Sequence, residues 1–423
     1  MSRQKKILYI TGGIGGESRE MEYHIRIIQN IFPDAEIHAV VLYQNLKANI
    51  PENVKLLNAG RKRTLNPFGK LINLFSWIKL TSSLKRKNKY YLKISNADPS
   101  NLVNLISELI TGGSLKKTVF RVAGLLSNIS LYQDSKIYGL LYKQFYKILY
   151  SLLYNRAYVI TFISETARKD AIKFGIKENK AKTIYNPLDI KIITNLSTQS
   201  TDDYLEKLYP FIITVGRLTK PKGQWYLLRI FKALKEKHKD LKLVILGEGE
   251  LKEYLLELSE KLGLKTFVWD RDNISEDFDV YFLGFHKNPF KFMARAKLFV
   301  FPSLWEGFPY ALVEAMACGV PVVSSDCRSG PREILAPSTD FTYQTDKPEF
   351  AEYGVLMPTF EVKFKSAREP LEEKEKMWVE VLDKLLKDEK LRKTYAMKAK
   401  ERTKDFSIDR IIRQWEEVLG WKP

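Results

Sequence analysis

Residues 302–326 read PSLWEGFPYALVEAMACGVPVVSSD, and this stretch decides the class of fold. The apolar run LFVFP that leads into it predicts a buried strand, and YALVEAMACG predicts a helix. Pro309 suits the first turn of that helix, because the N–H that proline lacks would have no partner there. VPVVSS then predicts a second buried strand. A strand, a short loop, a helix and another apolar strand together indicate a parallel sheet covered by helices.

The same alternation of apolar strands and amphipathic helices runs through most of the chain. The polar stretch NLSTQSTDD, residues 195–203, separates two groups of strands and is the predicted domain boundary. The predicted strands are KILYI, EIHAVVLY, YYLKIS, TVFRVA and YVITFIS before it, and FIITVG, KLVILG, VYFLG, LFVFPS and VPVVSS after it. We therefore expect two α/β domains, followed by a charged helical region with a solvated face and a final helix in SIDRIIRQWEEVL.

Charge is unevenly distributed along the 423 residues, whose formal net charge is +19. Residues 1–200 contain 31 Lys and Arg against 13 Asp and Glu, whereas residues 201–423 contain 38 against 37. With 45% hydrophobic and 28% charged residues, the composition is that of a folded globular protein rather than a disordered one. We expect the basic first half to face an anionic partner: nucleic acid, acidic phospholipid or a phosphorylated substrate.

Membrane-spanning and disulfide-stabilised classes do not fit the composition. Lysines interrupt the most apolar stretch, GLLYKQFYKILYSLLYNRAYVI, so that no run reaches the roughly 20 residues needed to span a bilayer. The N-terminal run ILYI is too short for a signal peptide and predicts a first strand. Cys318 and Cys327 are the only cysteines, which fits a reducing cytoplasm.

Candidate ligand groups follow the first predicted strand of the second domain. Gly216, Arg217 and Lys222 come after FIITV, at the carboxyl end of a strand, where open α/β sheets bind ligands. A planar guanidinium and a mobile ammonium together suit a diphosphate, although both could be ordinary loop cations. Further on, Gly247 and Gly249 are expected to permit a tight turn rather than to contact a ligand.

Two glutamates, Glu306 and Glu314, flank the loop and helix start in the opening stretch. Backbone N–H groups just after Pro309 can point at a phosphate. Glu314 lies about one turn into the helix, and its carboxylate can accept hydrogen bonds from two hydroxyl groups. Paired carboxylates could instead indicate the acid and base of a hydrolase, but no surrounding motif supports that function.

Two further motifs are less specific. The loop TGGIGG, residues 11–16, lies between a predicted strand and a predicted helix, where its glycines would either bring N–H groups close to an anion or simply make the turn. WDRDN contains Asp270 and Asp272 in the DxD pattern of metal-dependent transferases, but within a polar insertion. We expect a solvated loop there, and we predict no metal site and no cofactor.

Taken together, these motifs resemble the family-4 glycosyltransferases, which are retaining enzymes of the GT-B fold. The matching segments are FISE, IYNPLD, VGRLTKPKG, LVILGEGELKEYL, YFLGF, FPSLWEGFPYALVEAMACGVPVVSSD and SGPREIL. The resemblance is dense over residues 160–335 and thin over 20–155. In the thin part, many relatives have a histidine after a strand, whereas the corresponding run here, TVFRVAG, has Arg121 and Ala123.

The resemblance implies a fold and a domain plan. Two Rossmann-like parallel-sheet domains are expected to face each other across a cleft. The first, at 1–195, would bind the acceptor, and the second, at 204–400, would bind the nucleotide-sugar. A C-terminal helix, at 401–423, would return to the first domain.

The resemblance also assigns roles to single residues. Arg217 and Lys222 would grip the donor diphosphate and neutralise the leaving group. Glu314 would hold the ribose hydroxyls, and Glu306 would contact the hydroxyls of the donor sugar near the reacting carbon. The other expected donor-binding residues are Gly15, Gly16, Gly216, Phe285, Gly307, Phe308, Pro309 and Tyr310, with Ser329 and Gly330 as weaker additions.

The expected function is metal-independent, retaining transfer of a sugar from a nucleotide-sugar, expected to be a UDP-sugar, to a glycan in bacterial surface polysaccharide synthesis. Residues 61–93 mix Lys and Arg with Leu, Phe, Trp and Tyr, a combination typical of an anionic membrane interface. We therefore expect a lipid-linked acceptor and a cytoplasmic enzyme, peripheral on the inner face of the cell membrane. Nucleic acid is not expected, because no binding motif accompanies the basic residues. The alternatives are an epimerase of related fold and a non-catalytic sugar-nucleotide-binding protein.

Overall fold

The chain folds into two compact units. The computed structural model describes residues 4–12, 17–43, 51, 53–61, 66–128, 136–200, 208–273, 275 and 277–420. The first unit comprises residues 1–187 and 408–423, and the second comprises residues 188–407. Helix α7 (Ile190–Ser197) packs against α11 (Phe290–Met293) and α12 (Tyr310–Cys318) of the second unit, so the chain passes from one unit to the other before the expected boundary at 195–203.

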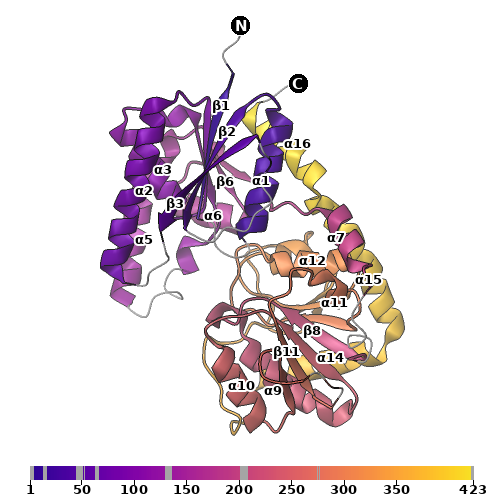
Figure 1. Cartoon of the computed structure of the whole chain (residues 1–423). Helices are drawn as coiled ribbons and strands as arrows, with labels where there is room; N and C mark the ends of the chain where they lie inside the picture. Colours follow the sequence, from indigo (N-terminus) through magenta and orange to yellow (C-terminus); the bar gives the residue numbers. More distant parts are fainter. Residues whose placement is uncertain are drawn as a thin grey trace. The chain divides into compact units, whose positions relative to one another are not determined.

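The first unit is built on a parallel seven-stranded sheet in the order β3-β2-β1-β4-β5-β6-β7. Its strands are β1 (Lys6–Thr11), β2 (Glu36–Tyr43), β3 (Val54–Arg61), β4 (Leu92–Asn96), β5 (Thr118–Val122), β6 (Val159–Phe162) and β7 (Ala181–Thr183). Its helices are α1 (Glu17–Ile31), α2 (Pro67–Lys87), α3 (Ser100–Ile110), α5 (Lys136–Leu152), α6 (Glu165–Lys173) and α16 (Ile408–Leu419). Figure 1 shows α2, α3 and α5 to the left of the strands and α1 and α16 to their right. The final helix α16 packs against α1 and buries Trp415.

The second unit is built on an eight-stranded sheet in the order β10-β11-β9-β8-β12-β13-β15-β14, in which only the pairing of β14 with β15 is antiparallel. Its strands are β8 (Phe211–Val215), β9 (Lys242–Leu246), β10 (Thr266–Val268), β11 (Val280–Gly284), β12 (Leu298–Phe301), β13 (Val322–Ser325), β14 (Glu349–Phe350) and β15 (Val355–Met357). Besides α7, α11 and α12, its helices are α9 (Gln224–Lys237), α10 (Lys252–Lys261), α13 (Pro331–Leu335), α14 (Glu373–Lys387) and α15 (Glu389–Thr403).

The predicted fold class is confirmed, because each of the ten predicted apolar runs contains a strand of one of the two parallel sheets. The charged helical region consists of two helices, α14 and α15, and α14 packs on α9. Within that packing, Trp378 is fully buried and Arg229 pairs with Glu375. The charged region therefore has an apolar, core-facing side as well as the expected solvated side.

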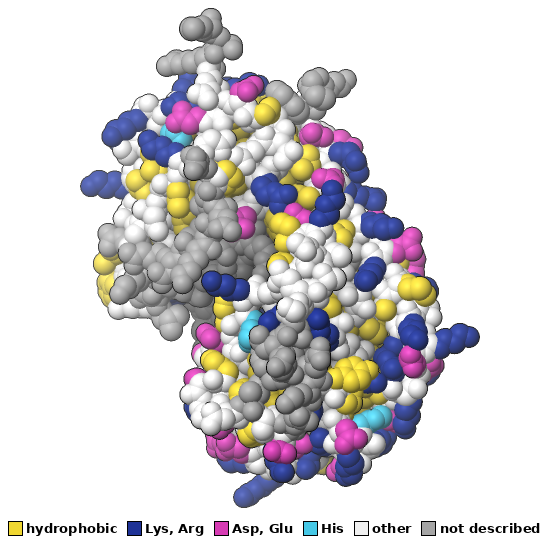
Figure 2. Space-filling view, turned by 45° about the vertical axis from the view of Figure 1, so that its right-hand side comes forward, with side chains coloured by type: hydrophobic (Ala, Val, Ile, Leu, Met, Phe, Trp, Pro, Cys, Tyr) yellow, Lys and Arg dark blue, Asp and Glu magenta, His cyan; other side chains and the backbone are white. Residues whose placement is uncertain are grey.

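Surface charge in the second unit is mixed, in line with its balanced composition. On the face that Figure 2 shows, Lys and Arg side chains are interspersed with Asp and Glu over this unit. Among the residues that the structure describes, no helix is long and apolar enough to cross a membrane.

Candidate active site

The predicted site residues gather at one edge of the second sheet. Strand β8 pairs with β9 on one side and with β12 on the other, so the strand order changes direction between β8 and β12. Lys222 follows the carboxyl end of β8, and Glu306 follows that of β12. Open α/β sheets bind ligands in the crevice at such a point, because the helices after the two strands leave to opposite faces.

An ion pair spans this point. The Nζ atom of Lys222 donates a hydrogen bond to Oε1 of Glu306 at 2.6 Å. The two side chains are only 18% and 10% exposed, so water screens the pair weakly. Lys222 also lies over the ring of Phe301, the last residue of β12, with Nζ 5.2 Å from the ring centroid. The ammonium is thus held in place by two groups from the same strand end.

Backbone contacts fix the two loops that carry this pair. The amide of Leu304, in the loop after β12, donates to the carbonyl of Pro221 at 2.7 Å. Gly223 has φ of 60°, and a Cβ atom there would lie 2.5 Å from the carbonyl oxygen of Pro302. Only glycine allows both that dihedral angle and that approach. The position of Lys222 therefore depends on the absence of a side chain at the next residue.

A third loop, after β13, supports Glu306 from its other side. The amide of Glu306 donates to the carbonyl of Arg328, and the amide of Ser329 donates back to the carbonyl of Glu306, both at 2.9 Å. The Ser329 hydroxyl donates to the carbonyl of Gly307 at 2.7 Å. At Gly330, with φ of 103°, a Cβ atom would lie 2.5 Å from Cδ of Pro309. Ser329 and Gly330, expected as weaker ligand contacts, thus brace residues 306–309.

The helix after this loop begins one residue later than expected. Pro309 occupies the N-cap position and Tyr310 is the first residue of α12, so Pro309 precedes the first turn instead of lying in it. The amides of Leu312 and Val313 donate to the carbonyl of Pro309 at 3.0 and 3.4 Å, and the first turn of α12 lies just beyond the carboxyl end of β12. Phe308 anchors the helix start, because its buried ring packs against Phe406 at 5.5 Å between centroids.

Glu314 lies on α12 and is 5% exposed. Its charge also acts on Cys318, one turn further along the helix. Burial first, and then the charge of Glu314, raise the pKa of the Cys318 thiol. Burial and the charge of Glu306 likewise raise the pKa of Cys327. Both thiols are therefore protonated at neutral pH and are unsuited to act as nucleophiles.

The remaining donor-binding candidates of the second unit lie along the same edge. Gly216 and Arg217 directly follow β8, and the Arg217 side chain is exposed. Gly247, after β9, approaches Gly216 so closely that a Cβ atom would lie 2.0 Å from the Gly216 carbonyl oxygen. Phe285 follows β11 and is 71% exposed, which leaves its ring accessible to a planar ligand group.

Sequence reasoning missed the residues that support these loops. The Gln224 side chain donates to the carbonyl of Arg217 at 2.9 Å and so ties the loop after β8 to the start of α9. Arg332 pairs with Asp326 at 2.6 Å between nearly buried side chains, which stiffens the loop after β13. Nothing in the residue type of Gln224 or Arg332 indicates this support, because it depends on contacts that only the folded chain makes.

The sequence also singled out residues of the first unit. Gly15 and Gly16 lie outside the described residues. Arg121, in the run where a histidine is expected from relatives, is buried near the carboxyl end of β5. Its guanidinium donates to the carbonyl of Ile184 at 3.0 Å and to Oδ1 of Asn186 at 2.5 Å. These bonds fasten the segment after β7 to the sheet, so Arg121 has a structural role there.

The DxD pattern is engaged in local contacts. Asp270 pairs with Lys252 at 2.7 Å, and Asp272 accepts a hydrogen bond from the amide of Val268 at 2.8 Å. These contacts hold the loop after β10. Within the described ranges, no cluster of three or more His, Cys, Asp or Glu side chains is placed to hold a metal ion.

Comparison with known proteins identifies the family. The family described as glycosyl transferases group 1 matches residues 201–341, which carry the ion pair and its supporting loops. An uncharacterized glycosyltransferase of Methanocaldococcus jannaschii is 35% identical over 382 residues, spanning 87% of this chain and 88% of that protein. The chain belongs to the glycosyltransferases. This glycosyltransferase is also 35% identical over 240 residues, or 57% of its length and 53% of the relative, to the Campylobacter jejuni N-acetylgalactosamine-N,N'-diacetylbacillosaminyl-diphospho-undecaprenol 4-alpha-N-acetylgalactosaminyltransferase.

Solved structures show the same fold for the glycosyltransferase over nearly its whole length. Anabaena HepE in complex with UDP and glucose aligns with a TM-score of 0.70 at 19% identity, covering 99% of this chain and 100% of that one. The lipopolysaccharide glycosyltransferase WaaG aligns with a TM-score of 0.67 at 15% identity, covering 99% and 100%. Two parallel-sheet domains of the GT-B type are therefore the architecture of this enzyme.

Proposed function

We propose that this enzyme transfers a sugar from a UDP-sugar to a lipid-linked glycan, with retention of the anomeric configuration, as a family-4 member. The observation that carries the proposal is the Lys222–Glu306 ion pair at the change of strand direction. An ammonium group has three N–H donors, and Glu306 takes one of them. The other two can bind oxygens of a diphosphate.

The reaction requires charge stabilisation at the leaving group. As the bond from the sugar to the diphosphate breaks, negative charge grows on the departing phosphate oxygens. Lys222 is already oriented by Glu306 and Phe301, and exposed Arg217 lies close by in sequence on the same loop. Such preorganised cations stabilise the transition state without rearrangement and without requiring a metal ion. The acceptor hydroxyl then attacks from the face that the diphosphate leaves, with a phosphate oxygen as base.

Two carboxylates would bind the other parts of the donor, namely its ribose and its sugar. Glu314, on α12, would accept hydrogen bonds from the ribose hydroxyls. Glu306 would contact the sugar hydroxyls and orient Lys222. Because Glu306 is paired with an ammonium at 2.6 Å, its negative charge is partly compensated, which argues for positioning rather than for nucleophilic attack.

The test is turnover with a panel of nucleotide-sugars and a membrane extract that contains acceptors. We expect nucleotide release with one donor, in the presence of a metal chelator, and a product whose new linkage has the donor's anomeric configuration by NMR. Release of UDP with inverted product would contradict the retaining mechanism, and dependence on added metal would contradict metal independence. If no donor in the panel is turned over, the proposal that the protein transfers these sugars is refuted.

Membrane association at the first unit is the second part of the proposal. Phe68, Leu71, Ile72 and Phe75 of α2 are all at least 50% exposed and follow the spacing of one helix face. On α5, Leu141, Phe145, Ile148 and Leu152 form a similar exposed row, with Lys147 among them. Figure 1 shows both helices on the same side of this unit. Exposed apolar rows can enter the acyl region of a bilayer, and cations beside them can contact anionic headgroups.

Flotation with vesicles tests the membrane association. We expect wild-type protein to float with vesicles that contain phosphatidylserine, less so at high salt, and the Phe68→Ser/Phe75→Ser variant to remain at the bottom of the gradient. Tyr343→Ser, which removes an exposed aromatic side chain of the second unit, is the control and should float like wild type. Equal flotation of all three proteins would refute the role of α2.

A further inference from the structure

Two cavities lie side by side along the amino edge of the sheet in the first unit. The larger, of about 660 Å³, is lined by residues that include Lys116, Arg156, Tyr158 and Lys180. The other, of about 270 Å³, includes Lys89, Tyr91 and Lys117 in its lining. Because Lys116 and Lys117 are consecutive residues, the two cavities flank the same short helical turn before β5. Neither cavity belongs to the candidate active site, which lies in the second unit.

The cations follow the order of the strands. In the sheet, β4, β5, β6 and β7 are successive neighbours. Lys89 precedes β4, Lys117 precedes β5, Arg156 precedes β6, and Lys180 precedes β7, each within three residues of the strand. Adjacent strands in a sheet are about 4.8 Å apart, so each of four neighbouring strands is preceded by a cation along the amino edge. Several cations that follow one another along a sheet edge match a ligand with several anions along its length.

These charges are available to a ligand. Lys89, Lys116, Lys117 and Arg156 are exposed, and none has an ion-pair partner among the residues for which the structure gives positions. Three neighbouring carboxylates are already paired with other cations: Glu108 with Lys85 and Lys93, Glu36 with Lys6, and Glu178 with Arg168. Lys180 donates to the carbonyls of Ala157 and Tyr158, which leaves its third N–H donor for a ligand.

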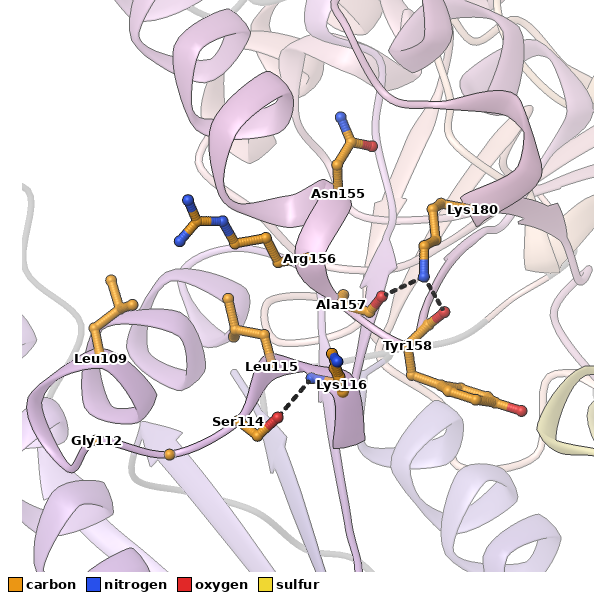
Figure 3. A pocket seen from close by; sticks show the side chains of 11 residues that line it. Leu109, Gly112, Ser114, Leu115, Lys116, Asn155, Arg156, Ala157, Tyr158 and Lys180 are labelled. Atoms are coloured by element: carbon orange, nitrogen blue, oxygen red, sulfur yellow. Dashed lines mark hydrogen bonds between the residues drawn. The ribbon is translucent and has the colours of Figure 1, made fainter.

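The cavity walls add surfaces suited to sugar rings. Tyr158 is 41% exposed and directly precedes β6. Tyr91, which directly precedes β4, is 43% exposed, although Lys5 Nζ lies over one face of its ring at 4.8 Å from the centroid. Figure 3 shows the Arg156 and Lys180 side chains on opposite sides of the segment that carries Ala157 and Tyr158. Aromatic faces bind the C–H faces of sugars, and the exposed backbone at Gly112 to Ser114 offers further hydrogen-bonding groups.

We propose that the amino edge of this sheet is a second binding site, which takes an extended acidic polysaccharide chain with a carboxylate or phosphate on successive sugars. This second-site proposal rests on the proposed function in one respect: the polysaccharide chain would be the acceptor or the product of the enzyme. A bilayer fits less well, because the cations line concave cavities, whereas the apolar rows suited to lipid lie on α2 and α5.

Direct binding, measured without turnover, tests the second site. The probe is polygalacturonate, with dextran as the neutral polymer and phosphatidylserine vesicles and a single-stranded oligonucleotide as the other anions. The cavity variant is Lys116→Gln/Lys117→Gln/Arg156→Gln. The matched control is Lys239→Gln/Lys390→Gln/Lys398→Gln, which removes three exposed lysines of the second unit. Both variants lose the same charge, and circular dichroism verifies that both are folded.

We expect wild type and control to bind polygalacturonate with the same Kd, and the cavity variant to bind at least about tenfold more weakly, the scale of a lost charge-assisted contact. Dextran should not bind, and salt should weaken the binding of polygalacturonate. Absence of binding by wild type, an equal loss in the control, or a cavity-dependent loss seen only with vesicles or the oligonucleotide would overturn the proposal. A cavity variant that transfers sugar normally yet fails to bind the polymer would separate this site from the catalytic function.

Discussion

The ammonium of Lys222 lies 2.6 Å from a carboxylate oxygen of Glu306, although the two residues are 84 positions apart in the chain. Each follows a strand of the parallel sheet, and the two strands, β8 and β12, are neighbours. The pair therefore joins the two halves of the sheet where a ligand can enter between them. The same geometry makes the catalytic proposal testable at single residues.

Replacing Lys222 by alanine should lower kcat/KM for the donor by at least about tenfold, because one charge-assisted contact to the diphosphate is lost. Lys220→Ala is the matched control, since Lys220 lies in the same short helical turn and the ion pair is formed by Lys222. Steady-state nucleotide release at varied donor concentration measures both. Equal kinetics for wild type and Lys222→Ala would remove Lys222 from the site.

Adding a methyl group at Gly223 should displace the loop that carries Lys222. Gly223→Ala places a Cβ atom 2.5 Å from the Pro302 carbonyl oxygen at φ of 60°. Gly263→Ala is the control, because Gly263 has φ of 70° but its nearest neighbour, Lys232 Nζ, is 3.7 Å away. Both variants should lose about 1 kcal/mol of stability from the dihedral angle, and only Gly223→Ala should also lose turnover. Equal turnover in both variants would show that the close approach does not position Lys222.

Breaking the buried pair between Arg229 and Glu375 should destabilise the second unit. The side chains are 1% and 0% exposed and lie 2.6 Å apart. Arg229→Met leaves a buried carboxylate without its partner and should cost about 3–5 kcal/mol in urea unfolding. Arg229→Met/Glu375→Met should recover part of that loss. By contrast, Arg271→Met breaks an exposed pair with Glu253 and should leave the unfolding midpoint unchanged. A double variant no more stable than the single one would contradict the pairwise origin of the loss.

His24 should make the stability of the first unit fall in mild acid. Burial first, and then the charge of Arg121, lower the pKa of His24 well below 6.5, so the folded state keeps it neutral. The unfolded chain takes up a proton as the pH falls below 6.5, which favours unfolding by up to about 1.4 kcal/mol per pH unit. Urea unfolding at pH 7.5 and 5.5 should therefore show a larger loss for wild type than for His24→Gln. The same loss in both proteins would refute this assignment.

Much of the fold was predictable from local pattern. The ten predicted strands are long apolar runs, whose burial on both faces leaves a signal in sequence. The strands that were not predicted are either short, such as β7, β10, β14 and β15, or polar, such as β3 with the sequence VKLLNAGR. These strands lie at or next to a sheet edge, where one side or face is less enclosed and sequence is less constrained.

The candidate site residues could be named from the sequence, whereas the contacts between them could not. Arg217, Lys222, Glu306 and Glu314 were expected as ligand groups because charged residues follow apolar strands. That Lys222 and Glu306 pair with each other was not foreseen, since pairing depends on which strands are neighbours. Pro309 was expected in the first helical turn, and the structure shows it as the cap of α12. Ser329 and Gly330 were added by resemblance, and the structure shows them bracing the loop.

The sequence by itself determined that this chain is a two-sheet α/β protein with a cationic loop, a carboxylate loop and a basic first half, because strand patterning, glycine turns and charge are local properties. Only the tertiary structure decided that β8 and β12 are adjacent, that Gly223 and Gly330 allow the loops to approach, and that cations of the first unit line up along four neighbouring strands. Each of these three arrangements brings together residues that are far apart in the chain. They follow from the order of strands in a sheet, which no local sequence pattern encodes.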